Sequence, residues 1–208
     1  MNSSYKQEFF MSENKQNVRN LVQIAAFTAL LAIMAQISIP MPAGVPMTMQ
    51  TLAVPLAGLI LGANRGTLAT VLYVLLGIFG VPVFAGFSGG PGIAFGITGG
   101  FIISFPVMAY LAGLGIQLAD KIHRSEASAK IKSLGVLYLF LLIGAVVNYI
   151  AGMLWFGRIA GTGMREAFVL SVLPFIPTSI IKIVLAGWMG PLLRTVLRRA
   201  HVLETSDV

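Results

Sequence analysis

The stretch "LVQIAAFTALLAIMAQISI", Leu21–Ile39, is 19 residues long and carries no charge. A helix needs about 20 apolar residues to cross the hydrocarbon core of a bilayer, so this stretch predicts a transmembrane helix. The uncharged region extends further, because no Lys, Arg, Asp or Glu occurs between Arg19 and Arg65 or between Arg65 and Asp120. Hydrophobic residues make up 57% of the 208 residues, which excludes an ordinary soluble domain.

Five more apolar segments follow, each bounded by prolines, glycines or polar residues. Three prolines in "PMPAGVP" end the first helix, "ANRG" forms the turn after the second, residues 120–132 form a polar loop, and "PFIP" breaks or kinks the sixth. The expected helices cover about residues 21–39, 51–62, 67–79, 99–119, 134–155 and 167–193. The sequence thus predicts an all-α integral membrane protein in which a six-helix membrane domain, residues 19–199, lies between a loose polar tail, residues 1–18, and a C-terminal tail, residues 200–208.

The basic residues indicate how the chain is oriented. Lys and Arg are retained on the cytoplasmic side of a membrane. The loops expected on the opposite side contain only Arg158 and Arg165. The other side holds Lys6, Lys15, Arg19, Arg65, Lys121, Arg124, Lys130, Lys132, Arg194, Arg198 and Arg199. We expect both termini in the cytoplasm of a cell-membrane protein. Because these cations sit at segment ends without interleaved aromatics, the net charge of +7 does not indicate nucleic acid as a partner.

The stretch "FSGGPGIAFGITGGF", Phe87–Phe101, is dense in glycine and is expected on the outer face. Glycines let the main chain approach a ligand closely, although a tight connecting loop fits the composition equally well. The stretch lacks the Lys-Ser/Thr pair of a phosphate loop, and no Walker sequence occurs elsewhere in the chain. The chain is therefore not expected to hydrolyse ATP by itself.

Lys182 is the one ionisable residue in the expected helices, and no Asp or Glu lies within them. Burying Lys in a membrane costs about 2.5 to 3.5 kcal/mol on insertion scales, so such a residue usually has a partner. We expect that partner to be the carboxylate of a bound ligand. The alternative is a bond to backbone carbonyls or an extension toward the cytoplasm. Ser179 lies three residues earlier, on the same helix face.

Asn148 and Tyr149 form a second polar insertion, in the outer half of the fifth helix. An amide offers donors and an acceptor, which suits a cyclic urea, although an interhelical hydrogen bond is an equal alternative for Asn148. Tyr149 and Trp155 are either ligand contacts or interfacial belt residues. Gln50, at the outer start of the second helix, is a weaker candidate.

Small residues form a stripe on the first helix at Ala25, Ala29 and Ala32. Ala25 and Ala29 make a small-xxx-small pair that lets another helix approach, either from a partner subunit or from the same chain. Catalysis is poorly supported, because the chain has no Cys, its two histidines (His123 and His201) fall in cytoplasmic segments, and the expected helices contain no carboxylate. This inventory gives no metal ligands and no acid/base pair, so we expect neither an enzyme nor a cofactor.

The sequence resembles the BioY family, the biotin-binding S components of energy-coupling factor (ECF) transporters. The likeness covers about residues 20–195. Its most specific parts are "AQISIPMPAGVPMTMQTLAVPLAGLILGANRGTLATVLYVLLGIFGVPVFAGFSGGPGIAFGITGGF", residues 35–101, and "PFIPTSIIK", residues 174–182. The resemblance implies an S-component-like fold of six membrane helices that binds biotin near the outer face for uptake.

The resemblance also implies partners. The family pattern A-x-x-x-A, matched by Ala25 and Ala29, implies docking to a transmembrane coupling subunit that carries two ATPase subunits. The alternatives are an autonomous carrier or channel for a small solute, and an S component for another vitamin.

Ligand contacts are implied for residues 84–100 and for the last two helices. We expect the ureido group of biotin to meet Asn148 and the backbone of Gly89, Gly90, Pro91 and Gly92. Phe84, Tyr149 and Trp155 are expected to cover its bicyclic body, while Lys182 pairs with the carboxylate or a ureido oxygen. The resemblance implies an acidic residue three positions before the lysine, but this chain has Ser179 there, so we do not expect a lysine–carboxylate pair within the protein.

Overall fold

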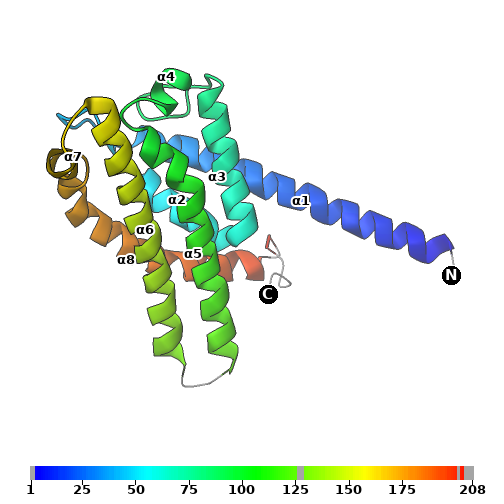
Figure 1. Ribbon diagram of the computed structural model, residues 1–208. Helices are drawn as coiled ribbons and strands as arrows, with labels where there is room; N and C mark the ends of the chain where they lie inside the picture. The colour runs from blue at the N-terminus through cyan, green and yellow to red at the C-terminus, as the bar shows by residue number, and fades with distance from the viewer. Residues whose placement is uncertain (1–2, 126–128, 201, 204–208) are drawn as a thin grey trace.

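The computed structural model of the protein describes residues 3–125, 129–200 and 202–203, and it is mainly helical (Figure 1). Two short strands, β1 (Ser38–Ile39) and β2 (Met47–Thr48), pair in antiparallel fashion. The helices are α1 (Ser3–Gln36), α2 (Gln50–Leu61), α3 (Ala63–Ile78), α4 (Pro91–Ala94), α5 (Gly99–Ser125), α6 (Lys130–Ala160), α7 (Met164–Ser171), the 3-10 turn η1 (Leu173–Phe175) and α8 (Ile176–Arg199).

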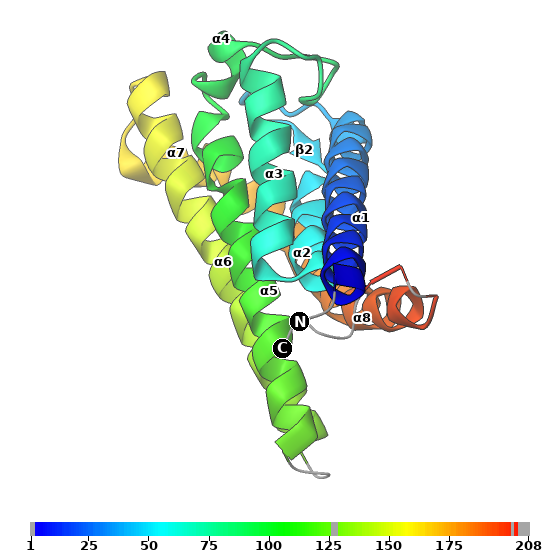
Figure 2. The same cartoon turned by 90° about the vertical axis from the view of Figure 1, so that its right-hand side faces the viewer.

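Four helical stretches are long and apolar enough to cross a membrane: Asn14–Gln36, Gly99–His123, Lys130–Ala160 and Met164–Arg199. The apolar helices α2 and α3 are shorter, with 12 and 16 residues. The long helices α5 and α6 run side by side along the bundle (Figures 1 and 2). Length and composition therefore support the class of protein expected from the sequence, a helical membrane protein.

Helix α2 lies at the centre of the bundle, where residues 52–61 are all buried. Glycines allow its backbone to contact the neighbouring helices directly. A Cβ atom on Gly58 would lie 2.0 Å from the carbonyl oxygen of Ala109 on α5, and one on Gly66 of α3 would lie 2.6 Å from the Cα atom of Gly58. Small residues at such crossings permit the close van der Waals packing that stabilises helices in a membrane.

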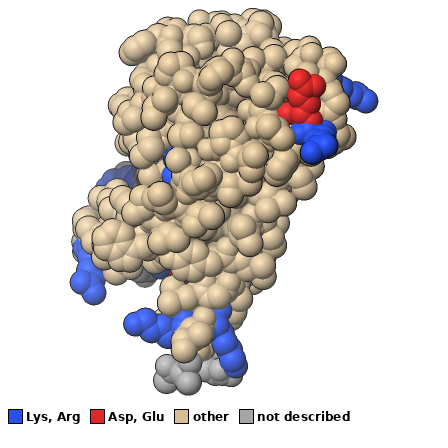
Figure 3. All heavy atoms as spheres, turned by 90° about the vertical axis from the view of Figure 1, so that its left-hand side faces the viewer, with Lys and Arg blue, Asp and Glu red and all other residues tan. Residues whose placement is uncertain are grey.

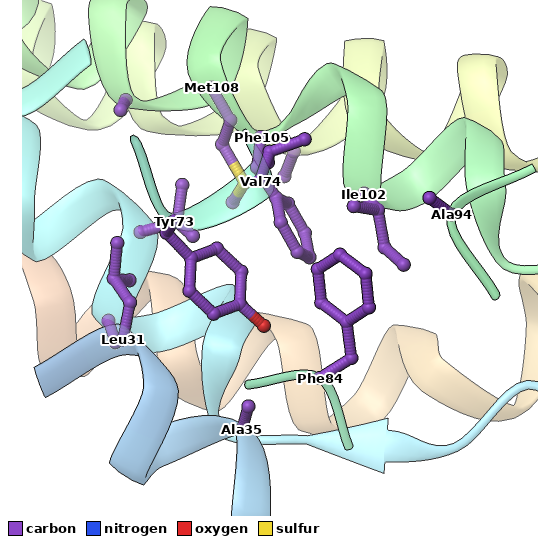
Figure 4. Packing of buried hydrophobic residues seen from close by; sticks show 13 residues of the cluster. Leu31, Ala35, Tyr73, Val74, Phe84, Ala94, Ile102, Phe105 and Met108 are labelled. Atoms are coloured by element: carbon purple, nitrogen blue, oxygen red, sulfur yellow. The ribbon is translucent and has the colours of Figure 1, made fainter. Parts of the chain in front are cut away.

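A second packing centre fixes the loop that follows α3. The ring of Phe84 meets that of Tyr73 edge to face, with centroids 5.6 Å apart (Figure 4). Phe84 fits there because Gly77 on α3 has no side chain: a Cβ atom would lie 2.0 Å from the phenyl ring. Leu31 and Ala35 of α1 belong to the same buried cluster. The loop is thereby anchored to both α1 and α3.

Polar contacts gather at the end of the bundle where α5 and α8 finish. Asp120 on α5 lies 3.8 Å from Arg194 and 3.6 Å from Arg198 on α8. Arg65, at the start of α3, donates to the side-chain oxygens of Asn20 (2.8 Å) and Gln23 (3.1 Å) on α1. The face drawn in Figure 3 carries its charged side chains mostly toward the edges, and most of its surface is uncharged. Helix α4 and the loop before it lie at the opposite end (Figure 2).

Several expected helix ends were wrong. Residues 3–18 belong to α1, so the expected loose tail is helical. The expected turn "ANRG" is the first turn of α3, because Gly62, with φ 85°, completes the connection by itself. The expected loop 120–132 is largely the end of α5 and the start of α6. Polar residues mark where a chain enters water, but they do not end a helix.

The interruption expected at "PFIP" is confirmed. Helix α7 ends at Ser171 and α8 begins at Ile176, with η1 between them. Pro174 lies in this break and cannot donate a backbone hydrogen bond. The β1–β2 hairpin around "PMPAGVP" was not expected. Of the C-terminal tail, residues 201 and 204–208, including His201, lie outside the described residues.

Candidate functional site

A cavity of about 370 Å³ opens at the end of the bundle that holds α4. Its walls come from the β2–α2 corner, the loop after α3, α4, the start of α5, the middle of α6 and the η1–α8 junction. Small-molecule sites usually measure about 300 to 1,000 Å³, so this volume suits one small ligand. Aromatic rings supply much of the lining, namely those of Phe84, Phe101, Phe105, Tyr149 and Phe175.

Lys182 reaches the cavity from the second turn of α8 and is 9% exposed. Its Nζ atom donates to the carbonyl oxygen of Thr48 (2.7 Å) and to Oγ1 of Thr51 (3.0 Å). An ammonium group has three N–H donors, so these two bonds leave one for a further acceptor. Among the described residues that line the cavity, Lys182 alone carries a charge. The cavity therefore favours a ligand that brings an anionic or strongly accepting group.

A chain of buried hydrogen bonds stabilises the corner that holds Lys182. The hydroxyl of Thr48 donates to Oε1 of Gln50 (2.8 Å), and Nε2 of Gln50 donates to the hydroxyl of Tyr73 (2.6 Å). Tyr73 in turn donates to the carbonyl oxygen of Val83 (3.1 Å). These bonds link the start of α2 to α3 and to the loop after it. They hold the acceptors of Lys182 in place before a ligand arrives.

Asn148 lies on α6, lines the cavity and is 2% exposed. Its Nδ2 atom donates to the carbonyl oxygen of Phe101 (2.9 Å) and to the hydroxyl oxygen of Ser104 (2.8 Å), both on α5. The interhelical hydrogen bond, one alternative raised by the sequence, is therefore present. Both amide hydrogens are used in these bonds, so Asn148 can offer a ligand only its carbonyl oxygen.

Tyr149 and Ser179 join α6 to α8 on another side of the cavity. The hydroxyl groups of the two residues are hydrogen-bonded to each other. The Tyr149 ring also meets Phe101 edge to face, with centroids 6.4 Å apart. Because α8 begins only at Ile176, the break at "PFIP" places Ser179 and Lys182 in its first two turns, beside the cavity.

Most of the residues singled out in the sequence come together here. Seven of the eleven expected binding residues line the cavity: Gln50, Phe84, Gly92, Asn148, Tyr149, Ser179 and Lys182. Gly89, Gly90, Pro91 and Trp155 are not among its lining residues. The role of all eleven as ligand contacts stays a prediction.

The residues outside the lining support the walls instead. The indole N–H of Trp155 donates to the carbonyl oxygen of Gly96 (2.9 Å), which does line the cavity. The backbone N–H of Gly90 donates to the carbonyl oxygen of Gly77 at the end of α3 (2.7 Å). A Cβ atom on Gly89 would lie 2.4 Å from the carbonyl oxygen of Val81. Gly89 therefore serves close backbone packing, and Gly90 has a φ of 94°, a conformation that favours glycine. Both roles fit the loop alternative raised by the sequence.

Thr48 and Thr51 were not singled out from the sequence, although both contact Lys182. They flank Gln50 in "TMQT", and three polar residues at the start of an apolar helix were the available signal. On α1, Ala25 and Ala29 are exposed, whereas Ala32 is half-buried and packs against the cluster that includes Leu31. Packing within the chain thus accounts for Ala32 but not for the other two.

The fold and the cavity define a helical membrane protein with a cavity of small-molecule size near one end of its bundle. Residues 6–199 match the BioY family. The chain is 42% identical over 159 residues to the probable biotin transporter BioY of Pyrococcus horikoshii, an alignment that covers 76% of this chain and 86% of that protein. It is 34% identical over 178 residues to the biotin transporter BioY of Rhodobacter capsulatus, with 81% and 90% covered.

The structure resembles a crystal structure of the S-component for biotin from an ECF-type ABC transporter. The TM-score is 0.73 and the sequence identity 26%, with 88% of this chain and 94% of that chain covered. The chain belongs to the BioY family.

Proposed function

We propose that this protein is the substrate-capture subunit, or S component, of an ECF-type ABC importer, and that it binds biotin at the extracellular side for ATP-driven uptake. The two relatives named above are described as a probable biotin transporter and a biotin transporter, and the structural neighbour is an S-component for biotin. This likeness supports both the ligand and the class of transporter.

The observation that carries the proposal is one buried ammonium group in an otherwise uncharged, largely apolar cavity. Biotin has a carboxylate, a polar ureido ring and an apolar thioether ring. Lys182 has one N–H donor left for the carboxylate or the ureido oxygen. Phe84, Phe105 and Phe175 provide apolar surface for the bicyclic body. Each chemical feature of the ligand thus has a counterpart in the lining.

We propose that the four long helical stretches and the shorter α2 and α3 form six transmembrane segments. Arg65, Lys121 and Arg194 lie toward the end of the bundle opposite the cavity. Because basic residues are retained in the cytoplasm, this end is assigned to the cytoplasm, together with both termini. The cavity then opens to the outside of the cell membrane, where a capture subunit meets its ligand.

The proposed partners are a transmembrane coupling subunit and two ATPase subunits. Ala25 and Ala29 lie on an exposed face of α1, where small side chains allow a second helix to pack closely. In this proposal the ATPase subunits hydrolyse the ATP that drives uptake, since the sequence contains no Walker motif of its own. Neither a metal nor a cofactor is part of the proposal.

Calorimetric titration of the detergent-purified protein with biotin and with biotin methyl ester tests the ligand. Saturable binding of biotin is expected, with weaker binding of the ester if Lys182 pairs with the carboxylate. Thermal unfolding with a panel of other vitamins tests specificity, because at equal concentration the ligand that binds more tightly stabilises the folded state more. A larger rise in melting temperature with another vitamin would overturn the assignment of biotin.

Proteoliposomes that contain only this chain test whether it transports biotin without partner subunits. An S component is expected to bind biotin without accumulating it, and to transport it once the coupling and ATPase subunits and ATP are added. Uptake by the chain alone, without ATP, would instead indicate an autonomous carrier or channel.

A further inference from the structure

Asn148 has a fixed amide orientation, and the residue that helps to fix it lies outside the cavity. The carbonyl oxygen of Phe101, 2.9 Å from Nδ2 of Asn148, is an acceptor that cannot donate. Only the NH₂ side of the amide can therefore face α5, because the reverse orientation would set two oxygens against each other. This leaves Oδ1 as the polar atom that Asn148 can present to the cavity it lines.

Ser104 takes part in the same arrangement. Its hydroxyl donates to the carbonyl oxygen of Phe101 (3.0 Å), so its single hydrogen is already used. The Ser104 oxygen is then free only to accept, and it receives the second amide hydrogen of Asn148 at 2.8 Å. Ser104 is 7% exposed and is not among the residues that line the cavity. It acts on the cavity through Asn148.

No described residue donates a hydrogen bond to Oδ1 of Asn148, since every hydrogen bond of this side chain runs from Nδ2. Oδ1 is accessible from the cavity, so a ligand that places an N–H group there gains a hydrogen bond inside a largely apolar site. Lys182 donates two hydrogen bonds to Thr48 and Thr51, and its third N–H is suited to an acceptor on the ligand. The cavity thus combines one site for a ligand acceptor with one for a ligand donor.

We infer that Ser104 is a positioning residue that makes Asn148 a hydrogen-bond acceptor for an N–H group of the ligand. The inference rests on the proposed function, in which the donor is one of the two ureido N–H groups of biotin. It assigns a direction to this contact: the protein accepts and the ligand donates. A ligand whose corresponding nitrogen carries a methyl group loses the bond and meets the amide oxygen with a methyl group instead.

The test compares biotin with its two N-methyl isomers, each methylated on one ureido nitrogen. The wild-type protein should bind one isomer at least about tenfold more weakly than biotin, the size of one lost hydrogen bond to a buried group. In Ser104→Ala the amide is held less firmly, so biotin should bind about fivefold more weakly and the discrimination between biotin and that isomer should shrink. Ser104→Thr keeps the hydroxyl and should restore the discrimination.

Ser133→Ala is the matched control. Ser133 is also a serine that joins α5 to α6, through a 2.9 Å bond to the carbonyl oxygen of Ala119, but it lies away from the cavity. Its loss should leave the ratio of the two affinities unchanged, even if the melting temperature falls. If Ser104→Ala also leaves the ratio of the two affinities unchanged, Ser104 has a purely structural role and the inference is overturned.

The wild-type protein provides a second test that needs no variant. If it binds both N-methyl isomers as tightly as it binds biotin, the assignment of Asn148 as acceptor is wrong while the proposed function stands. If it binds neither biotin nor the isomers, the proposed function itself fails. The two failures are therefore distinguishable.

Discussion

Gln36, at the last turn of α1, is hydrogen-bonded to the backbone of Phe84, 48 residues further along the chain. Its Nε2 atom donates to the carbonyl oxygens of Phe84 (3.1 Å) and Val83 (3.3 Å), and its Oε1 atom accepts from the backbone N–H of Phe87 (2.8 Å). Phe87 has φ 54°, a left-handed conformation that is unfavourable for a non-glycine residue. One side chain of α1 thus holds the loop that brings Phe84 into the cavity.

Gln36→Leu should therefore loosen this loop and let biotin leave faster. Losing these bonds is expected to raise the dissociation rate by about tenfold, with a smaller change in the association rate. The measurement is release of labelled biotin into an excess of unlabelled biotin. Gln117→Leu, a half-buried glutamine on α5 at the opposite end, is the matched control. Equal release rates for the two variants would show that Gln36 does not control the loop.

Lys182→Met removes the charge of the cavity at similar length. If Lys182 pairs with the carboxylate, biotin should bind roughly 10- to 100-fold more weakly, the range for hydrogen bonds to charged groups. Biotin methyl ester should bind the variant and the wild type about equally, which separates loss of the ion pair from general damage to the corner at Thr48. A similar loss for both ligands would exclude the pairing of Lys182 with the carboxylate. Lys121→Gln, exposed at the other end, should change neither affinity.

Trp155→Phe tests whether the hydrogen bond behind the cavity wall contributes to the affinity for biotin. The substitution keeps an aromatic ring but removes the indole N–H that is bonded to the carbonyl oxygen of Gly96. We expect biotin to bind about fivefold more weakly, the typical value of one neutral hydrogen bond. Trp188→Phe is the matched control, because Trp188 lies on α8 and is 65% exposed. If Trp155→Phe binds biotin as tightly as this control does, the indole bond does not support the site.

Gly58→Ala tests the packing of the central helix. The added Cβ atom would lie 2.0 Å from a backbone oxygen of α5, and such overpacking typically costs about 1 to 3 kcal/mol of stability. The melting temperature in detergent should fall. Gly135→Ala, on α6, has no atom within 4 Å of the new Cβ atom and should leave the melting temperature unchanged or slightly higher. Equal melting temperatures for the two variants would contradict the close approach of α2 and α5.

The sequence predicted the helical membrane class because uncharged stretches of that length have few other stable environments. It also predicted the break at "PFIP", where Pro174 cannot continue the hydrogen-bond ladder. Helix ends were harder, because polar residues such as those before Arg19 continue a helix into water. The contact of Lys182 with Thr48 joins residues 134 positions apart, and no local pattern indicates such a pairing. Likewise, nothing in "GGPG" distinguished Gly89 and Gly90, which serve the backbone of the loop, from Gly92, which lines the cavity.

Ala29→Leu tests the proposed docking face on α1. Ala29 is exposed, so a leucine fits the isolated subunit without a clash, and biotin binding should be unchanged. In the transporter, however, the larger side chain would push a closely packed partner helix away. Co-purification with the coupling and ATPase subunits, and ATP-driven uptake, should both fall at least about tenfold, as expected when packing worth roughly 1.4 kcal/mol or more is lost.

Ala160→Leu makes the same change at an exposed position of α6 and should leave assembly intact. A variant with leucine at position 29 that assembles and transports as well as this control would place the docking surface elsewhere. Weaker biotin binding by Ala29→Leu would lead to a different conclusion. Gln36 lies seven residues from Ala29 on the same helix, so such a loss would mean that changes along α1 reach the loop that carries Phe84.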